Sequence, residues 1–456
     1  MPQLRQTYLG ASTHQTLCIM PHSHPRPLVP TGRCFISSMP DELLCRILGY
    51  LAPVRTPNTG FLYEPCLPLS LVCRRWERLN YSFLYRNIDL GYFGWQKLRR
   101  IRQLWKTLRQ RAHLCDAVRM VGFQHNQPCD ATLEIVAEIL GYLTGLRNFE
   151  LHTKLAESTW IILNAALGAP LATLKLSGSE VGPSLQMILK HFSMPTLKEL
   201  SLNGYGLGNE DEPGAYHPSN NVQEDLRLFL SSASLSNVTT VELIDPRAPV
   251  HMTRSFLQWP VRLTSLTMRA CSAEYTVDAV QGILDHHRHT LQHISLPELR
   301  RGFHWMPAFS SFKSLESLQI HGQNLFMESP RWAVGKLDAP RLRHLRISFE
   351  REDQHDTHYT DFEVDRIDWL EDFFGHITPT NNRLETVFVD FDPADVSIMD
   401  FDWFSYFTWP WSHIDQAVGM FASHNITMTY PQPHCSKKDW DRAVKRQDEE
   451  DARGSG

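Results

Sequence analysis

Two groups of histidines combine residue types that could bind a metal ion. His355 and His358 stand among carboxylates, and His286, His287 and His289 follow one another closely. Imidazole and carboxylate groups are ordinary zinc ligands. Both groups lie in polar segments and lack the ligand spacing of a zinc site. We therefore expect solvated histidines, no metal ligands and no bound cofactor.

Motifs for covalent or phosphate chemistry do not occur in the sequence. It has no GxSxG, HExxH or GxxxxGK[ST] pattern. GYGLG at residues 204–208 lacks the third glycine of a dinucleotide motif, and the NEDE that follows would repel phosphate. We expect no catalytic residues and no enzymatic activity. The rival hypothesis of a hydrolase or other enzyme would need a nucleophile and a base that no motif supplies.

Cysteine content and hydropathy favour a reducing compartment. The nine cysteines include no CxxC pair, and unpaired thiols are usual where the cell keeps cysteines reduced. The sequence contains no run of about 18 apolar residues, the length that spans a membrane. Residues 1–34 lack the apolar stretch of a secretion signal. We expect cytoplasm and/or nucleus, with no membrane contact.

Composition favours a chain that mostly folds. Apolar residues make up 42% of it and charged residues 21%, as in globular proteins. Its 456 residues exceed the roughly 250–300 that one core usually spans, so two units or one elongated array are both consistent. The net charge of -5 gives no overall basic footprint, and nucleic acid is not the expected partner.

One pattern recurs through the middle of the chain: an apolar residue followed by two more, three and five positions later. Such alternation predicts a half-buried strand. Six of the eight intervals between copies are 24 to 28 residues, and the other two are 41 and 42. The copies begin at Leu146, Leu171, Leu197, Val238, Leu263, Leu291, Leu315, Leu342 and Leu384.

Helix-like stretches lie between the copies, at residues 132–143, 184–192 and 276–287 for example. A unit of one strand and one helix is too small to bury its own apolar face, so neighbouring units must stack. The predicted fold is therefore α/β: a solenoid with a curved parallel sheet inside and helices outside, over residues 117–430. The two long intervals predict loop insertions near 204–221 and 349–368.

The remaining segments have less pattern. Residues 1–34 and 431–456 are expected to be a disordered leader and a disordered charged tail. The acidic segment 350–372 and the aromatic run 401–411 could form a pocket for a basic partner, or a cap on the last repeat.

Residues 84–116 are expected to be linker helices. The stretch 95–114 carries seven basic residues and no acidic one, with apolar residues on its inner side. Nucleic acid or an acidic partner could bind it, although a solvated outer face is the simpler interpretation.

Two short helices near the start have more apolar surface than they can bury alone. Pro40 suits the first turn of the first helix, and acidic residues follow it, as helix starts favour. Its wide apolar stripe consists of Leu43, Leu44, Ile47, Leu48 and Leu51.

The second predicted helix opens at Pro68, and its arginines are expected to stay solvated. One face carries Leu69, Val72, Cys73 and Trp76. A unit of about 45 residues is too small for a sizeable core, so a partner surface is expected to cover these stripes.

Residues 35–83 resemble the F-box family. The connection between the helices is longer than is usual in the family, and residues 84–90 resemble the segment that follows the F-box in fungal members. The matching residues are Pro40, Leu43, Ile47 and Leu51, then Leu71, Val72, Cys73, Arg74 and Trp76.

The resemblance implies that this region binds a Skp-family adaptor, which docks on the core of a cullin-RING ubiquitin ligase. The repeats resemble the leucine-rich type that many F-box proteins use to bind a protein substrate. A non-catalytic substrate receptor is the implied function. An F-box scaffold or trafficking protein without cullin, and an ordinary helical cap on the repeats, are the alternatives. The expected adaptor-binding residues are Pro40, Leu43, Leu44, Ile47, Leu48, Leu51, Leu71, Val72, Cys73 and Trp76.

Every second residue of the predicted strands should point out from the concave face. That face is mixed and polar, and no residue on it identifies the substrate. The candidate substrate-binding residues are Lys175, Glu199, Glu242, Arg269, His293, His321, Arg346 and Phe388.

Overall fold

A curved parallel sheet runs through most of the chain. The computed structural model describes residues 39–50, 54–56, 60–62, 67–90, 97–125, 130–153, 160–178, 195–205, 236–300, 302–349, 364–376, 383–391 and 411–432, with short pieces between 436 and 453. Twelve strands form one sheet in chain order, and all neighbours are parallel. They are β3 (Asn87–Asp89), β4 (Met120–His125), β5 (Asn148–Thr153), β6 (Thr173–Ser177), β7 (Glu199–Asn203), β8 (Thr240–Ile244), β9 (Ser265–Arg269), β10 (His293–Ser295), β11 (Ser317–His321), β12 (His344–Ser348), β13 (Thr386–Asp390) and β14 (Thr427–Thr429).

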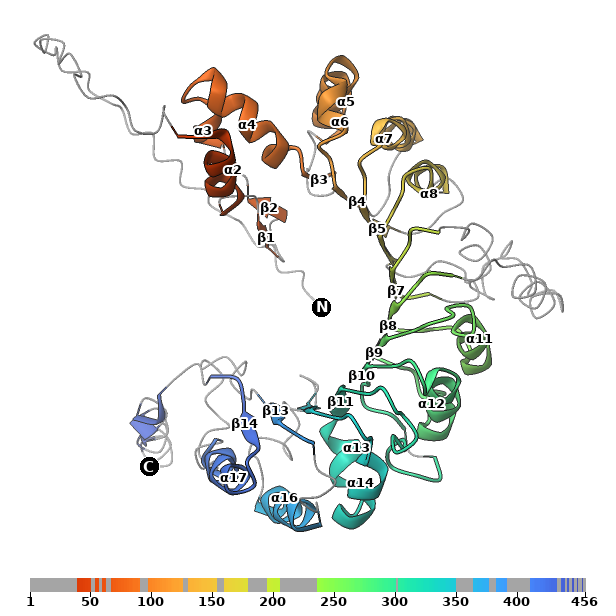
Figure 1. Cartoon of the computed structure of the whole chain (residues 1–456), viewed down its shortest axis with the longest axis vertical. Coiled ribbons are helices and arrows are strands. Elements are labelled where there is room, and N and C mark those ends of the chain that lie inside the picture. The colour runs from red at the N-terminus through yellow and green to blue at the C-terminus, as the bar shows by residue number, and fades with distance from the viewer. Residues whose placement is uncertain are drawn as a thin grey trace, which may run out of the picture.

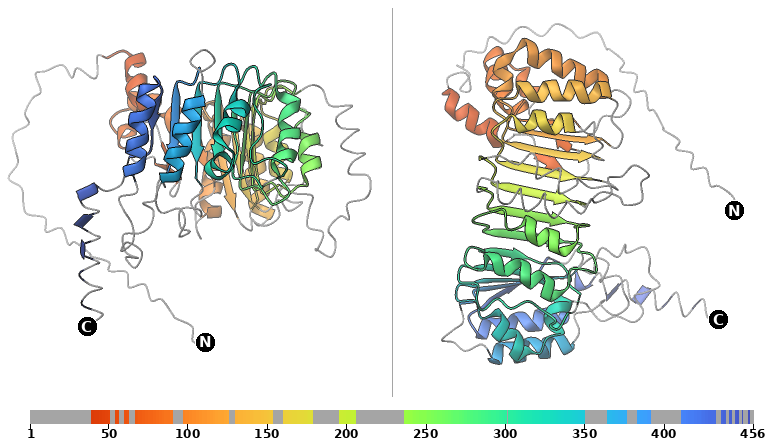
Figure 2. Two further views of the ribbon diagram at one scale, coloured as in Figure 1. Left: turned by 90° about the horizontal axis from the view of Figure 1, so that it is seen from below. Right: turned by 90° about the vertical axis from the view of Figure 1, so that its right-hand side faces the viewer.

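The strands line the inside of an arch and the helices cover its outside (Figures 1 and 2). Parallel neighbours need a crossover connection, and helices supply most of these, whereas the described residues between β10 and β11 form an irregular segment. The predicted α/β class is confirmed. None of the helices in the described ranges has the length and apolar character needed to cross a bilayer. The outer helices are α5 (Lys97–Gln110), α6 (Ala112–Cys115), α7 (Asp130–Tyr142), α8 (Trp160–Leu167), α11 (Val250–Phe256), α12 (Val277–Leu284), the 3-10 turn η2 (Asp285–His287), α13 (Gly322–Phe326), α14 (Pro330–Leu337), α16 (Val364–His376) and α17 (Ser412–Ser423).

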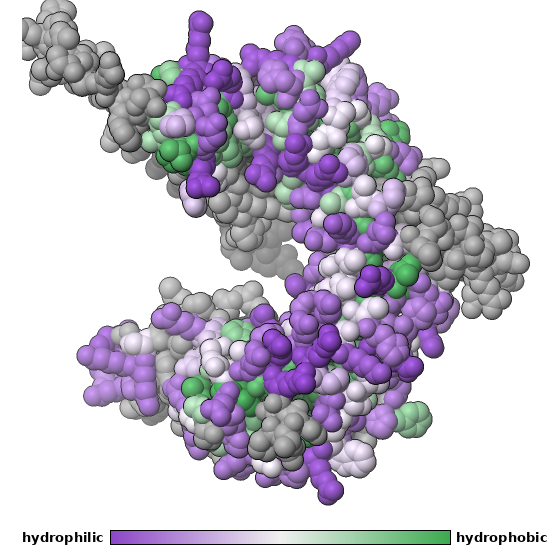
Figure 3. Space-filling model, viewed as in Figure 1, coloured by the Kyte–Doolittle hydropathy of each residue, from purple (hydrophilic) through white to green (hydrophobic). Residues whose placement is uncertain are grey.

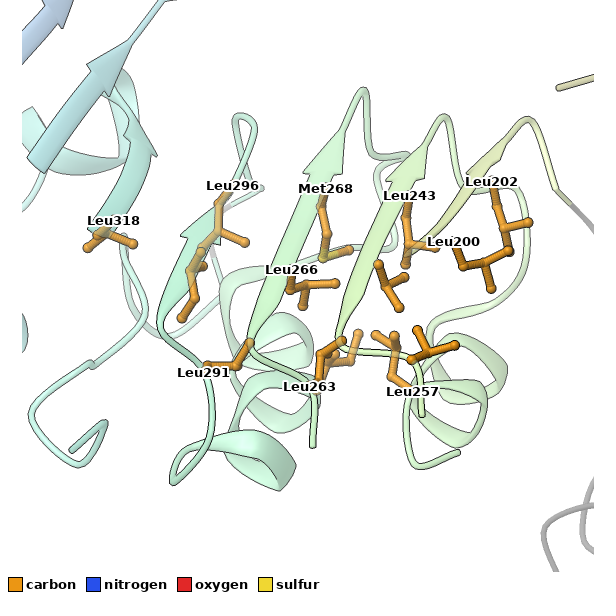
Figure 4. Close-up of a cluster of buried hydrophobic side chains, with 14 of the residues drawn as sticks. Leu200, Leu202, Leu243, Leu257, Leu263, Leu266, Met268, Leu291, Leu296 and Leu318 are labelled. Carbon is orange, nitrogen blue, oxygen red and sulfur yellow. The ribbon is translucent and has the colours of Figure 1, made fainter. Parts of the chain in front are cut away.

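The recurring apolar pattern forms buried rows that run across the sheet. The residue that opens each copy lies in the turn before its strand and is buried, and the two that follow point from the strand toward the helices. Figure 4 shows these side chains between strands and helices. One row places side by side Leu174, Leu200, Val241 and Leu266, and the next row Leu176, Leu202, Leu243 and Met268.

The sheet extends further toward the N-terminus than the sequence pattern predicts. Residues 84–116 were expected to be linker helices, but β3 pairs with β4 and begins the sheet. Helix α5 packs against α7, and its Ile101 and Leu108 are buried in the common core. The expected boundary at residue 117 is therefore wrong, because residues 87–89 and 97–115 already belong to the first strand and the first helices of the arch.

At the other end, β14 pairs with β13 and completes the sheet. Trp411, the last residue of the aromatic run, is fully buried ahead of α17. Residues 401–410, the leader 1–34, and most of both predicted insertions lie outside the described residues, and the tail is described only in short pieces.

A buried asparagine joins two irregular segments of the outer layer. The Asn324 Oδ1 atom accepts a hydrogen bond from the Leu299 amide at 2.8 Å, and its Nδ2 atom donates to the carbonyls of Leu299 and Trp305 at 2.8 and 2.9 Å. Leu299 and Trp305 lie outside the named strands, and buried polar groups are costly when unpaired. The Asn324 side chain therefore satisfies backbone groups of this loop, as hydrogen bonds between strands do in the sheet.

Two buried tyrosines share a threonine between neighbouring repeats. The Tyr275 hydroxyl donates to the carbonyl of Ala248 at 2.8 Å and lies 2.7 Å from the Thr253 hydroxyl, which is 3.1 Å from the Tyr205 hydroxyl. Gly204 turns the chain into Tyr205 with a φ of 69°, a conformation that favours glycine. Burial raises the pKa of Tyr275 to about 12, and burial also raises the pKa of Tyr205 well above its usual value.

We expect the free energy of unfolding to fall between about pH 10 and pH 12. In the unfolded chain both tyrosines ionise near pH 10, whereas the fold holds them neutral, so stability is complete below pH 10 and is lost as pH rises toward 12. For Tyr275 alone the loss is on the order of 2–3 kcal/mol. Urea unfolding of wild type and Tyr275→Phe at pH 9 and pH 11.5 measures it.

The loss with pH should be smaller in Tyr275→Phe than in wild type. Tyr50→Phe, which alters an exposed tyrosine, is the matched control and should leave the pH dependence unchanged. Equal losses in wild type and Tyr275→Phe would contradict the assignment of this loss to the buried cluster.

Candidate functional site

A small helical unit precedes the arch at its N-terminal end (Figure 1). It consists of α2 (Asp41–Tyr50), the paired short strands β1 (Val54–Thr56) and β2 (Gly60–Leu62), α3 (Leu67–Ser70) and α4 (Arg74–Leu84). Pro40 accepts the first backbone hydrogen bond of α2, from Leu44, at 3.2 Å. Strands β1 and β2 are antiparallel, so the long connection between the first two predicted helices contains a hairpin.

The second predicted helix is two helices, α3 and α4, separated by a turn. Cys73 is extended, with φ of -164° and ψ of 167°, and serves as the N-cap of α4. The buried Asn80 in α4 donates a hydrogen bond to the Ser70 hydroxyl at 2.7 Å, which holds α3 across the break. The prediction that Leu69, Val72 and Cys73 share one helix face is wrong, because Leu71 and Val72 lie in the turn.

Ion pairs tie α2 to α4. The Arg75 Nε atom donates to the Asp41 carboxylate at 2.7 Å, its Nη2 atom donates to the Met39 carbonyl at 2.5 Å, and Arg78 pairs with Asp41 at 3.1 Å. The expectation that these arginines stay solvated is wrong for Arg75, which is half-buried in these contacts, whereas Arg74 and Arg78 are exposed as expected. Opposite charges 34 and 37 residues apart leave no local pattern from which the pairs could be predicted.

The helical unit exposes a cluster of large apolar side chains, which we call the apolar surface. Its members are Leu43, Ile47, Tyr50, Leu71 and Val72, with exposed fractions of 47, 42, 85, 87 and 62%. They are five of the ten large apolar residues that are exposed within the described part of the chain. Figure 3 shows apolar side chains over this end of the molecule. Such a concentration marks a surface that a partner covers.

Two residues expected on this surface lie inside the unit. Leu44 and Leu48 are 1 and 0% exposed, because α2 turns these positions inward as it packs against α4. Leu51 lies outside the described residues. Pro40 and Cys73 are exposed, and Trp76 is half-buried. The sequence showed the apolar stripe of α2. In a helix of 10 residues with apolar groups on several sides, however, the sequence does not reveal which of them pack inside the domain and which stay exposed.

Comparison with known protein families gives a match over this same unit. Residues 36–91 match the F-box-like family model. The chain carries an F-box-like domain. No curated protein matches the chain. F-box domains bind Skp-type adaptors, and the matched range contains all five residues of the apolar surface.

The concave face of the arch is the second candidate site. The side chains expected to point away from the helices are exposed or half-buried along β6 to β13, apart from His321, and they alternate with buried ones. Seven of the eight predicted substrate-binding residues lie on this face: Lys175, Glu199, Glu242, Arg269, His293, Arg346 and Phe388.

His321, the eighth residue, is not on the open face. It is 1% exposed at the end of β11, where its ring caps α13 by accepting from the Gln323 amide at 3.4 Å. Its ring also packs near Phe349, with centroids 6.3 Å apart. The alternation fails here because α13 begins directly after β11 and covers the last strand position.

Charged groups on the concave face pair with the neighbouring strands. Lys175 lies 3.2 Å from the buried carboxylate of Glu150, and Arg269 lies 3.5 Å from Glu242. Glu242 also accepts a hydrogen bond from Ser201 at 2.8 Å. The polar residues therefore form cross-strand ladders, an arrangement that fixes their positions ahead of any ligand.

In the C-terminal half of the concave face, an arginine stacks on an aromatic ring. Arg346 on β12 pairs with Asp390, and its guanidinium lies 4.8 Å from the centre of the Phe388 ring on β13. His344 hydrogen-bonds to Thr386 at 2.8 Å. Arginine stacked on an aromatic ring is well suited to interface contacts.

The histidines considered as metal ligands do not form a site in the described residues. His287 is buried, and its Nε2 atom lies 2.5 Å from the Leu257 carbonyl, while His286 and His289 are exposed. Burial lowers the pKa of His287 below its usual value. Its role is to join η2 to the turn after α11. His355 and His358 lie outside the described residues.

We expect Leu44→Ala and Leu43→Ala to differ sharply in effect. Leu44→Ala leaves a cavity and should lower the free energy of unfolding of the F-box-like domain by about 2–5 kcal/mol. Leu43→Ala removes an exposed side chain and should change it by about 0.5 kcal/mol or less. Hydrogen exchange of the α2 and α4 amides measures both, and equal protection in the two variants would show that Leu44 is not part of the domain interior.

Proposed function

We propose that this protein is the substrate-receptor subunit of a Skp-cullin-F-box ubiquitin ligase. The F-box-like domain binds a Skp-family adaptor, the adaptor joins the receptor to the cullin-RING core, and the arch binds a protein substrate. Other subunits transfer ubiquitin, and this chain contributes proximity rather than chemistry. The observation that carries the proposal is the apolar surface within the residues that match the F-box-like model.

The apolar surface supports adaptor binding on energetic grounds. Full burial of a leucine, isoleucine or valine side chain contributes about 1.5–3 kcal/mol. Leu43, Ile47, Leu71 and Val72 come from α2 and from the turn before α4, and the Asp41 ion pairs hold α2 against α4. The surface is thus preformed, which lowers the entropy lost on association.

Contacts between α4 and the arch support the role of a rigid receptor. Arg111, next to α6, donates to the Tyr81 hydroxyl at 3.0 Å and lies 5.8 Å from the centre of its ring. The rings of Tyr81 and His113 are 6.4 Å apart. A domain fixed to the first repeat in this way holds a substrate on the concave face at a set distance from the adaptor.

The arch supports the substrate-binding role by its resemblance to leucine-rich-type repeats. Most of its strands follow the preceding strand after 24 to 28 residues, and the strands create a long concave face. The cross-strand ion pairs and the Arg346–Phe388 contact give this face the polar and aromatic groups that are common in protein interfaces. A folded or extended segment of another protein is the proposed ligand, without any catalytic role for the face.

Leu43→Asp combined with Ile47→Asp should abolish adaptor binding. Both side chains are exposed, so the fold survives, while two carboxylates would have to be desolvated at the interface. Leu43 and Ile47 have about half of their surface left to bury, so the loss of these two contacts alone corresponds to roughly tenfold or more in Kd. Affinity purification of full-length wild type and double variant, with mass spectrometry, measures the retained adaptor and cullin.

Phe303→Asp combined with Trp332→Asp is the matched control, because it places the same charges at exposed apolar positions elsewhere on the arch. It should retain the adaptor. Adaptor without cullin in the wild-type sample would favour a scaffold or trafficking role. Adaptor retained by the Leu43→Asp, Ile47→Asp variant would disprove the proposed interface.

Arg269→Ala combined with Arg346→Ala and Phe388→Ala should reduce the capture of substrate proteins by roughly tenfold or more while leaving adaptor binding intact. These residues lie on β9, β12 and β13 of the concave face. Quantitative mass spectrometry of proteins that co-purify with wild type but not with the variant checks this. An unchanged set of co-purified proteins would place substrate binding elsewhere.

A further inference from the structure

Helix α5 presents a stripe of basic side chains on the outside of the arch, next to the F-box-like domain. We call Arg99, Arg102, Lys106 and Arg109 the basic stripe. These residues are three or four positions apart, which places them on one face of the helix, and all four are exposed. Ile101 and Leu108 anchor the opposite face in the core. At 1.5 Å per residue the stripe is about 15 Å long.

The positive charges of the basic stripe destabilise helix α5. The first turn holds Lys97, Arg99 and Arg100 with no acidic residue, although the positive end of the helix dipole favours acidic groups there. Arg102 and Lys106 form a like-charge pair at four residues, and like charges at this spacing destabilise a helix. A sequence that breaks several local rules together marks a functional surface more often than a structural one.

Little within the described residues compensates this charge. Arg99, Arg102 and Lys106 form no ion pair there. Arg109 is engaged at the end of the stripe, with its guanidinium 5.3 Å from the centre of the Trp105 ring. The three others are therefore available to an anionic partner.

The surroundings of the stripe select among anionic partners. Helix α7 packs against α5 and carries exposed acidic residues every four positions, at Asp130, Glu134 and Glu138. Hydrogen bonds from Tyr142 and then Trp105, with a smaller contribution from the Arg109 charge, lower the pKa of Glu138, and this carboxylate therefore lies near the Arg109 end of the stripe. A nucleic-acid duplex, about 20 Å wide, would bring further phosphates against these carboxylates.

Single-stranded nucleic acid also fits poorly. Proteins bind it by stacking bases on exposed aromatic rings beside a basic groove. Within the described residues of this helix and its start, the aromatic residue is Trp105, which packs against the core and is covered by Arg109. A narrow chain with side-chain carboxylates matches the length, width and charge of the stripe better.

We propose that the basic stripe of α5 binds an acidic segment of a partner protein. The contact consists of carboxylates paired with Arg99, Arg102 and Lys106, and it stabilises α5 by removing the repulsion within the stripe. This site is separate from the apolar surface and from the concave face, and it does not depend on the ligase role.

The test uses the full-length chain and a fluorescein-labelled peptide of ten glutamates, followed by fluorescence anisotropy. We expect binding by wild type that weakens at high salt. The variant Arg99→Gln with Arg102→Gln and Lys106→Gln should bind roughly ten- to a hundredfold more weakly, as the loss of three exposed ion pairs predicts. The same variant should melt at or above the wild-type temperature, because repulsion is removed.

The matched control is Arg262→Gln with Lys313→Gln and Arg341→Gln, which removes three exposed basic groups elsewhere on the arch. It should bind the peptide within about twofold of wild type. The proposal is overturned if wild type does not bind, if both triple variants lose affinity equally, or if the stripe variant melts lower. It is also overturned if a ten-nucleotide single-stranded RNA binds the stripe more tightly than the peptide.

Discussion

The structure depends on apolar rows that no single repeat can complete. Leu174, Leu200, Val241 and Leu266 touch because their strands pair in register, and each is buried only while its neighbours are present. A shift of one residue would turn these rows toward the concave face and place the polar residues in the core. From β3 to β14, the strand register therefore determines which side chains are buried, and their burial in turn stabilises that register.

The same register orders the concave face. Parallel strands lie about 4.8 Å apart, so side chains at equivalent positions meet their neighbours directly. Glu150 with Lys175, and Glu242 with Arg269, are consequences of that spacing. The polar ladders are thus held by the apolar rows on the other side of the sheet, and any ligand of this face meets groups whose positions are already set.

The strands were predictable because their apolar residues recur at +3 and +5, and helix α12 was predictable from its period and its Thr276 cap. Strands β3 and β14 were not, since these three-residue strands lie outside the nine copies of the pattern. Long-range polar contacts were also beyond prediction: the Asp41–Arg75 pair, the Asn324 loop contacts and the burial of His321 all join residues whose closeness only the fold creates. The F-box resemblance located the apolar surface, but the turn at Leu71 and Val72 decided which residues form it.

Because the strands lie in the sheet in chain order, a nascent chain can add them one at a time as it leaves the ribosome. Each strand has its earlier neighbour already in place, and none must wait for a distant segment. The F-box-like domain and β3 emerge before β4 and give the growing sheet a covered starting edge. Strand β14, at the other edge of the described sheet, is short and lies beside α17, which leaves little open edge on which another chain could continue the sheet.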